Sequence, residues 1–162
     1  MSLESPDFAP VPEAPQFKIA LVAAQFNPRW TNLLLEKTRR ALLAGGAVEE
    51  HLHIYRVPGS NEIPFAVQMA AESGKIDVVV ALGVLKKGAT AHYHIVAQSV
   101  SDALQMVALN TGVPVVNGVM VVDNEEQAAE RVDGAIDRAA EFARTALAMA
   151  QVRVQLGELY GE

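Results

Sequence analysis

The sequence predicts an α/β fold, in which helices cover both faces of a parallel sheet. Short apolar runs rich in β-branched residues alternate along the chain with longer segments of helical periodicity. The apolar runs are nearly continuous, as expected for strands that are buried on both faces. With 162 residues, the chain is too short for a TIM barrel, which usually needs about 250. The prediction is therefore a three-layer sandwich built on a four-stranded parallel sheet.

The elements are expected in a regular order after a proline-rich start. Strands are expected at 17–24 (FKIALVAA), 48–57 (VEEHLHIYRV), 76–84 (IDVVVALGV) and 113–122 (VPVVNGVMVV). Helices are expected at 29–45, 62–74, 90–112 and 124–150, several of which close on glycine, a common helix stop. Residues 1–16 hold four of the eight prolines and are expected to form an extended N-terminal arm. Residues 17–162 then make a single domain.

Composition excludes several classes of protein. The net charge of −6 argues against a general nucleic-acid binder, which needs a basic face. The absence of cysteine excludes disulfides, thiol nucleophiles and cysteine-based zinc sites. Neither a secretory leader nor an apolar run of about 20 residues is found, so a cytoplasmic protein without a membrane partner is expected.

Ligands of such sheets bind beyond the carboxyl ends of the strands, so the loops there hold the candidate residues. Phe26 follows the first strand, where its ring either stacks on a planar ligand or caps the core. Ser60, Asn61 and Glu62 follow the second strand and open a helix. Glu62 either caps that helix or accepts hydrogen bonds from a polyhydroxyl ligand, and the segment by itself favours the cap.

The stretch KKGATAHYH, residues 86–94, follows the third strand. Ala89 and Thr90 are expected to start a helix, whose free amides and threonine hydroxyl suit a phosphate group; the alternative is a plain polar loop. Neither GxxxxGK[ST] nor GxGxxG is present, which disfavours a nucleoside triphosphate or a dinucleotide. His92 lies in the first turn near the same loop, whereas His94 lies about 200° further round the helix.

The remaining histidines and the fourth loop give weaker signals. His92 and His94 cannot face one metal ion, and His51 and His53 share a strand face without a third ligand, so no metal site is expected. After the fourth strand, Asp123 or Asn124 caps a helix. Arg131 lies two turns into it, and a lone helix arginine is usually a solvated or salt-bridged surface group.

Taken together, these loops resemble the lumazine synthase family of riboflavin biosynthesis. The resemblance covers Phe17 to Met149 and rests on five motifs in order: QFN, VPGSNEIP, ALGVLKKGATAHYHIV, PVVNGVMV and NEEQAAER. It implies a flavodoxin-like strand order of 2-1-3-4. It also implies condensation of 5-amino-6-(D-ribitylamino)uracil with 3,4-dihydroxy-2-butanone 4-phosphate to 6,7-dimethyl-8-ribityllumazine, without a cofactor or metal.

The resemblance further implies roles for the loop residues that hold the uracil substrate. Phe26 matches the aromatic residue that stacks on the ring, and the backbone of Leu85 and Lys86 matches the pair that reads the pyrimidine edge. The ribityl chain is expected at the SNE segment, whose members are Ser60, Asn61 and Glu62.

The phosphorylated substrate is expected at the loop after the third strand. Ala89 and Thr90 match the phosphate loop, Arg131 the phosphate-binding arginine, and His92 the proton-transfer histidine. Asn117 matches a residue that completes the pocket of a neighbouring subunit. The family resemblance therefore implies a homopentamer, with a 60-subunit shell and association with riboflavin synthase as further options.

The chain also departs from the family pattern, which usually reads IRG[AED]TPHF[DE] at this loop. Here Lys86 stands for the aliphatic residue, Ala91 for proline and His94 for the acid. The segment from Asp133 to Arg138 is about one residue short. Three alternatives therefore stay open: a paralogue that binds a lumazine or flavin with weak or no turnover, a shell-forming structural protein, and a flavodoxin-like redox domain.

Overall fold

A computed structural model of the chain describes residues 9–11 and 14–160. Its strands form one parallel sheet in the order β2-β1-β3-β4. The four strands are β1 (Ile19–Ala24), β2 (Leu52–Val57), β3 (Val78–Lys86) and β4 (Val115–Val122). The predicted α/β class and strand order are therefore confirmed.

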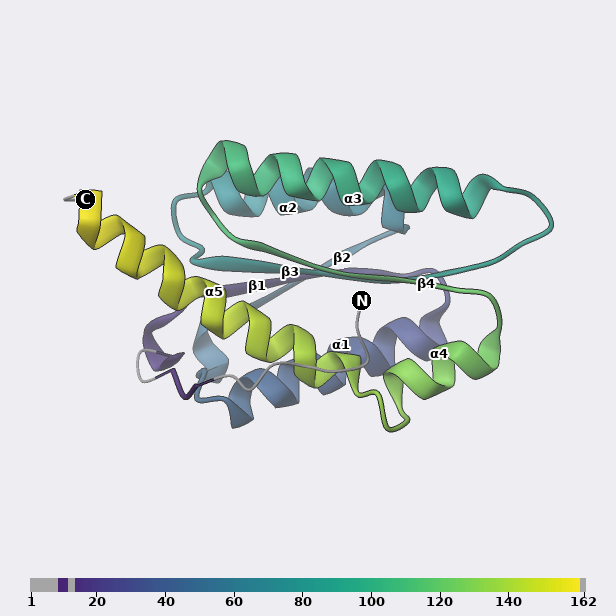
Figure 1. Ribbon diagram of the computed structural model, residues 1–162, viewed down its shortest axis with the longest axis horizontal. Coiled ribbons are helices and arrows are strands. Elements are labelled where there is room, and N and C mark those ends of the chain that lie inside the picture. The colour runs from purple at the N-terminus through teal and green to yellow at the C-terminus, as the bar shows by residue number, and fades with distance from the viewer. Residues whose placement is uncertain (1–8, 12–13, 161–162) are drawn as a thin grey trace.

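Helices cover both faces of the sheet, as Figure 1 shows. One face carries α2 (Ile63–Glu72) and α3 (His92–Thr111), and the other carries α1 (Pro28–Ala44), α4 (Glu125–Val132) and α5 (Arg138–Tyr160). Single turns of 3₁₀ helix also occur: η1 (Ala14–Gln16), η2 (Glu49–His51) and η3 (Ser60–Glu62). The architecture is the expected three-layer sandwich.

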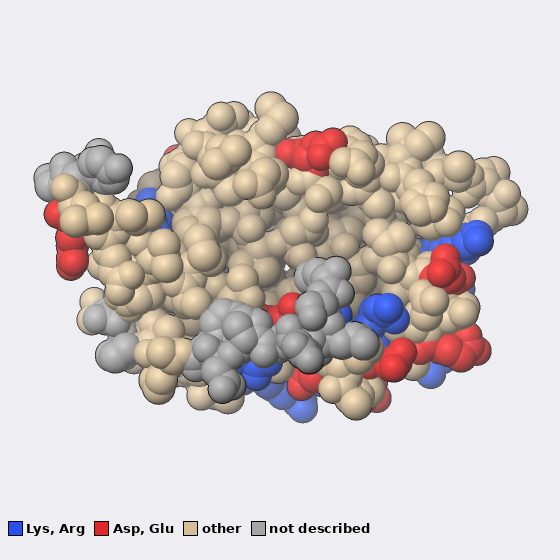
Figure 2. All heavy atoms as spheres, viewed as in Figure 1, with Lys and Arg blue, Asp and Glu red and all other residues tan. Residues whose placement is uncertain are grey.

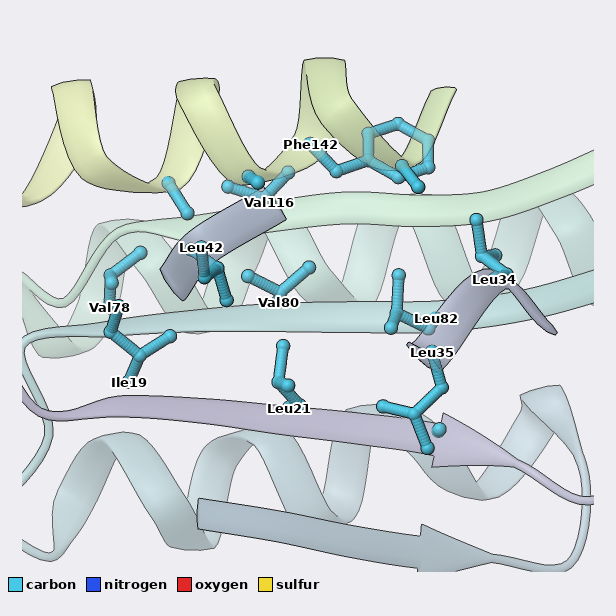
Figure 3. Close-up of a cluster of buried hydrophobic side chains, with 14 of the residues drawn as sticks. Ile19, Leu21, Leu34, Leu35, Leu42, Val78, Val80, Leu82, Val116 and Phe142 are labelled. Atoms are coloured by element: carbon cyan, nitrogen blue, oxygen red, sulfur yellow. The ribbon is translucent and has the colours of Figure 1, made fainter. Parts of the chain in front are cut away.

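The central strand β3 explains why the apolar runs of the sequence are continuous. Successive side chains of a strand point to opposite faces, so Val80 and Leu82 pack toward α1 and α5 while Val79 packs toward α2 and α3. In Figure 3, Val80 and Leu82 lie beside Leu42 and Leu34 of α1. Because both faces are covered, every β3 residue from Val78 to Val84 is buried, and no polar alternation is required.

The prediction of one helix over residues 124–150 is wrong, because the segment forms two helices. The chain turns between α4 and α5 at Gly134, where a Cβ atom would lie 2.6 Å from the carbonyl oxygen of Glu130. Asp137 then adopts a left-handed conformation with φ of 33°. Of the two predicted caps of α4, Asn124 is the one used, since its side chain accepts a hydrogen bond from the amide of Gln127 at 2.9 Å.

The predicted N-terminal arm lies mostly outside the described residues. Its end forms the single turn η1, in which Ala14 is fully buried against the core. Val11 also packs against that core. The division into an arm of residues 1–16 and a domain of residues 17–162 stays a prediction.

Candidate active site

The carboxyl edge of the sheet is stepped. β1 pairs with β3 as far as Ala23 and Leu82, whereas β3 and β4 remain paired as far as Lys86 and Val122. Residues 83–86 therefore extend beyond β1, with no strand beside them on that side. The side chain of Asn27 reaches across, donating a hydrogen bond from Nδ2 to the carbonyl oxygen of Val84 at 2.7 Å. The end of β3 that β1 leaves unpaired forms one wall of a pocket through Val84, Leu85 and Lys86.

This pocket, of about 590 Å³, collects most of the predicted site residues. Eight of the eleven line it: Phe26, Ser60, Asn61, Glu62, Leu85, Lys86, Thr90 and His92. They come from the loops after β1, β2 and β3 and from the start of α3, which lie far apart in the sequence. Ala89, Asn117 and Arg131 are not among its lining residues.

Phe26 presents its ring to the pocket instead of to the core. The residue is 70% exposed, which excludes the core-cap alternative. Asn27, the next residue, adopts a left-handed conformation (φ 53°) and starts α1 with Pro28 in the first turn. Gly59 lies close by, where a Cβ atom would come within 3.3 Å of Phe26 Cδ2. The exposed ring can therefore stack on a planar ligand.

The SNE segment lies opposite this ring. The carboxylate of Glu62 accepts a hydrogen bond from the amide of Gly59 at 2.9 Å through Oε2, so it has the capping role that the sequence favoured. Its Oε1 has no hydrogen-bond partner among the described residues and stays available to a ligand hydroxyl. Ser60 is buried, and it fits because Gly83 has no side chain: a Cβ atom there would lie 2.7 Å from Ser60 Oγ.

The loop after β3 differs from the prediction in where its helix begins. α3 starts at His92, with Ala91 as its N-cap, and not at Ala89 and Thr90. Within the described chain, the amides of Ala89 and Thr90 donate no hydrogen bond, and both residues are exposed. A bend with free amides ahead of a helix is still suited to an anion.

The two histidines at the start of α3 are separated as predicted. His92 lines the pocket, whereas His94 does not. The His94 ring packs instead on Tyr93, with ring centroids 4.2 Å apart. Of these two histidines, His92 is therefore the one that borders the space for a ligand.

Sequence reasoning missed a polar network that borders the pocket. The ammonium group of Lys86 donates to Glu125 Oε1 at 2.6 Å, and the indole N–H of Trp30 donates to Glu125 Oε2 at 2.5 Å. The hydrogen bond from Lys86, followed by that from Trp30, lowers the pKa of the Glu125 carboxyl below its ordinary value. The guanidinium of Arg29 lies over the Trp30 ring, 4.5 Å from its centroid. The three elements β3, α1 and α4 meet at one carboxylate.

Two predicted residues lie away from the pocket of their own chain. Arg131 in α4 donates to the carbonyl oxygen of Gln127 at 3.3 Å and keeps about a third of its side chain exposed. Asn117 in β4 donates to Ser101 Oγ at 3.3 Å and lines a separate groove of about 1270 Å³ bordered by β4, α5 and the end of α3.

No group of three or more histidine, aspartate and glutamate side chains is placed to hold a metal ion within residues 9–11 and 14–160. Over the same ranges, no helix has both the length and the apolar character that a membrane crossing requires.

Comparison with known proteins identifies the family. Residues 16–153 match the family model described as 6,7-dimethyl-8-ribityllumazine synthase. Proteins of that name from Halorhodospira halophila and Edwardsiella ictaluri are 41% and 43% identical, each over 86% of this chain and 90% of the relative. One from Xanthomonas oryzae is 39% identical over 74% of this chain and 78% of the relative. The chain therefore belongs to the 6,7-dimethyl-8-ribityllumazine synthase family.

Proposed function

We propose that the chain condenses 5-amino-6-(D-ribitylamino)uracil with 3,4-dihydroxy-2-butanone 4-phosphate to form 6,7-dimethyl-8-ribityllumazine. The observation that carries the proposal is the pocket itself. An exposed aromatic ring, the unpaired end of β3, the carboxylate of Glu62 and the pair of Thr90 and His92 surround a single cavity of about 590 Å³. Each of these groups suits one part of the two substrates.

The uracil substrate occupies the end of the pocket near β1. Its ring stacks on Phe26, and its ring amides pair with the backbone of Leu85 and Lys86 on the strand edge that β1 leaves open. The ribityl hydroxyls reach Asn61 and the free oxygen of Glu62. Planar stacking combined with backbone hydrogen bonds is how many sites recognise a flat heterocycle.

The phosphorylated substrate occupies the other end, at the loop before α3. The free amides of Ala89 and Thr90 bind its phosphate, and His92 lies beside them at the helix start. The 5-amino group attacks the ketone to form an imine with loss of water, and phosphate then leaves before the second ring closes. Both steps need proton transfer near neutral pH, for which histidine is suited.

The direct test mixes the purified protein with both substrates and follows the absorbance of the lumazine product. We expect a rate well above the uncatalysed reaction at saturating substrate concentrations. A rate equal to the uncatalysed background, with lumazine or flavin still bound, would favour the alternative of a binding paralogue without turnover.

We further propose that the active form is a homopentamer in the cytoplasm, in which Asn117 of one subunit completes the pocket of the next. Asn117 lies outside the pocket of its own chain, which is consistent with a role across an interface. Large apolar side chains are exposed on α2 and α3, among them Phe65, Ile95 and Leu109. In Figure 2 the side of α3 that faces the viewer carries few charges.

Exposed apolar surface of this kind marks an interaction surface. Light scattering at micromolar concentration is expected to give five times the chain mass of 17.3 kDa or a multiple of that assembly. A mass of one chain would refute the pentamer. The 60-subunit shell and the association with riboflavin synthase stay predictions.

A further inference from the structure

The network of Lys86, Glu125 and Trp30 has no role in the proposed reaction, although Lys86 lines the pocket. Lys86 is the last residue of β3, and its side chain is on the sheet face that packs against α1 and α4. Lys86 is the one lysine among the residues that line this pocket, and its ammonium is held by Glu125. An unpaired ammonium there would attract any anion that enters.

Both oxygens of the Glu125 carboxylate are occupied within this network. Oε1 accepts from Lys86 Nζ at 2.6 Å, and Oε2 accepts from the indole N–H of Trp30 at 2.5 Å. Trp30 is buried, so one side of the carboxylate is anchored to a fixed ring. Glu125 is thereby held in position to bind Lys86, and the charge of the pair is close to zero.

We propose that Glu125 is a positioning residue that holds the Lys86 ammonium away from anions in the pocket and so weakens the binding of phosphate there. A lysine side chain is flexible enough to pair with either partner, and Glu125 competes with the anion for it. The inference rests on the proposed function in one respect. If the chain catalyses the reaction, the phosphate that it releases would inhibit it more weakly than it would without Glu125. The binding itself does not depend on turnover.

The chain offers a matched control variant for a test of this proposal by phosphate binding. Glu126 follows Glu125 in the same first turn of α4, is exposed, and makes no hydrogen bond or ion pair among the described residues. Glu126→Gln changes the net charge of the protein by the same amount as Glu125→Gln. Only Glu125→Gln removes the charged partner of Lys86, and the amide oxygen of the glutamine can still accept the hydrogen bond from Trp30.

The sequence contains a single tryptophan, Trp30, so its fluorescence reports directly on the network. Inorganic phosphate is titrated at constant ionic strength into the wild type, Glu125→Gln, Glu126→Gln and the double variant Glu125→Gln/Lys86→Met, with calorimetry as a second measurement. Thermal melts confirm that each variant is folded. Pairing with a half-exposed lysine changes affinity by about two- to fivefold.

We expect Glu125→Gln to bind phosphate about two- to fivefold more tightly than the wild type, and Glu126→Gln to match the wild type. The gain should disappear in the double variant, because no ammonium is left to release. An equal gain in phosphate affinity in both single variants would show that net charge causes the effect. A gain that persists in the double variant would show that the phosphate binds away from Lys86. Either result overturns the proposal. Absence of lumazine formation by the wild type would refute the proposed function but leave these binding results unaffected.

Discussion

Replacement of Phe26 separates its proposed binding role from a structural one. Because 70% of the side chain is exposed, folding buries only about a third of it. Full burial of a phenylalanine contributes about 1.5–3 kcal/mol, so Phe26→Ala should lower the free energy of unfolding by only about 0.5–1 kcal/mol. Loss of stacking on a base-like ring costs about 1–3 kcal/mol, which corresponds to about a 5- to 150-fold weaker binding of the uracil substrate.

The assay measures the Michaelis constants of both substrates for a series at this one position, together with thermal melts. Phe26→Tyr retains the aromatic face and should stay near the wild type, whereas Phe26→Leu retains only the apolar character and should resemble Phe26→Ala. The Michaelis constant of the phosphorylated substrate should change little. A leucine variant that binds the uracil substrate as well as the tyrosine variant does would refute stacking, and equal losses for both substrates would indicate general damage to the site.

Four further predictions follow from the structure. His92→Ala should lower turnover by at most about 10²–10⁴-fold, because orientation of the two substrates preserves part of the rate. His94→Ala should lower turnover less than His92→Ala does. The reverse order at equal folded fraction would show that the proton-transfer residue is misassigned. Arg131→Ala should raise the Michaelis constant of the phosphorylated substrate more than that of the uracil, and equal increases would exclude a phosphate contact. The hydrogen bond from Lys86 lowers the pKa of Glu125, so the stabilising effect of the Glu125 carboxylate is full above about pH 4.5 and is lost as the pH falls through the pKa of the folded state. The melting temperatures of the wild type and Glu125→Gln should therefore converge in acid. A difference that stays constant with pH would contradict this. Gly118→Ala should destabilise the fold by about 1–3 kcal/mol in chemical denaturation, because the added Cβ atom would lie 2.7 Å from a backbone carbonyl oxygen of β3. An unchanged denaturation midpoint would show that β3 and β4 can separate there.

The strands and their order could be predicted because burial on both faces leaves a strong local signal. Each strand begins and ends within a few residues of its predicted bounds, as the buried run from Val78 to Val84 illustrates. The break between α4 and α5 left no such signal. Val132 and Ala139 are both fully buried and lie seven residues apart, so the helical spacing of apolar residues continues across the turn. Within this segment, Gly134 was the one residue whose type indicated a break in the helix.

The candidate site was predictable where it consists of short loops after strands. Phe26, Glu62 and His92 share one pocket because parallel strands bring their carboxyl ends to the same edge of the sheet. The pairing of Lys86 with Glu125 could not be predicted, since 39 residues separate them and each reads as an ordinary surface charge. It depends on how the first turn of α4 lies over the end of β3, which only the tertiary structure specifies.

The stepped edge of the sheet also affects how the protein behaves without a ligand. Beyond the buried part of β3, Leu85 and Lys86 have no paired strand on the β1 side. An uncovered strand edge is a template for pairing with another chain, and so a starting point for aggregation. A flat heterocycle bound there would protect this edge, and a ligand at a hundred times its dissociation constant stabilises the folded state by about 2.7 kcal/mol. A ligand in the pocket should therefore raise the melting temperature of the protein.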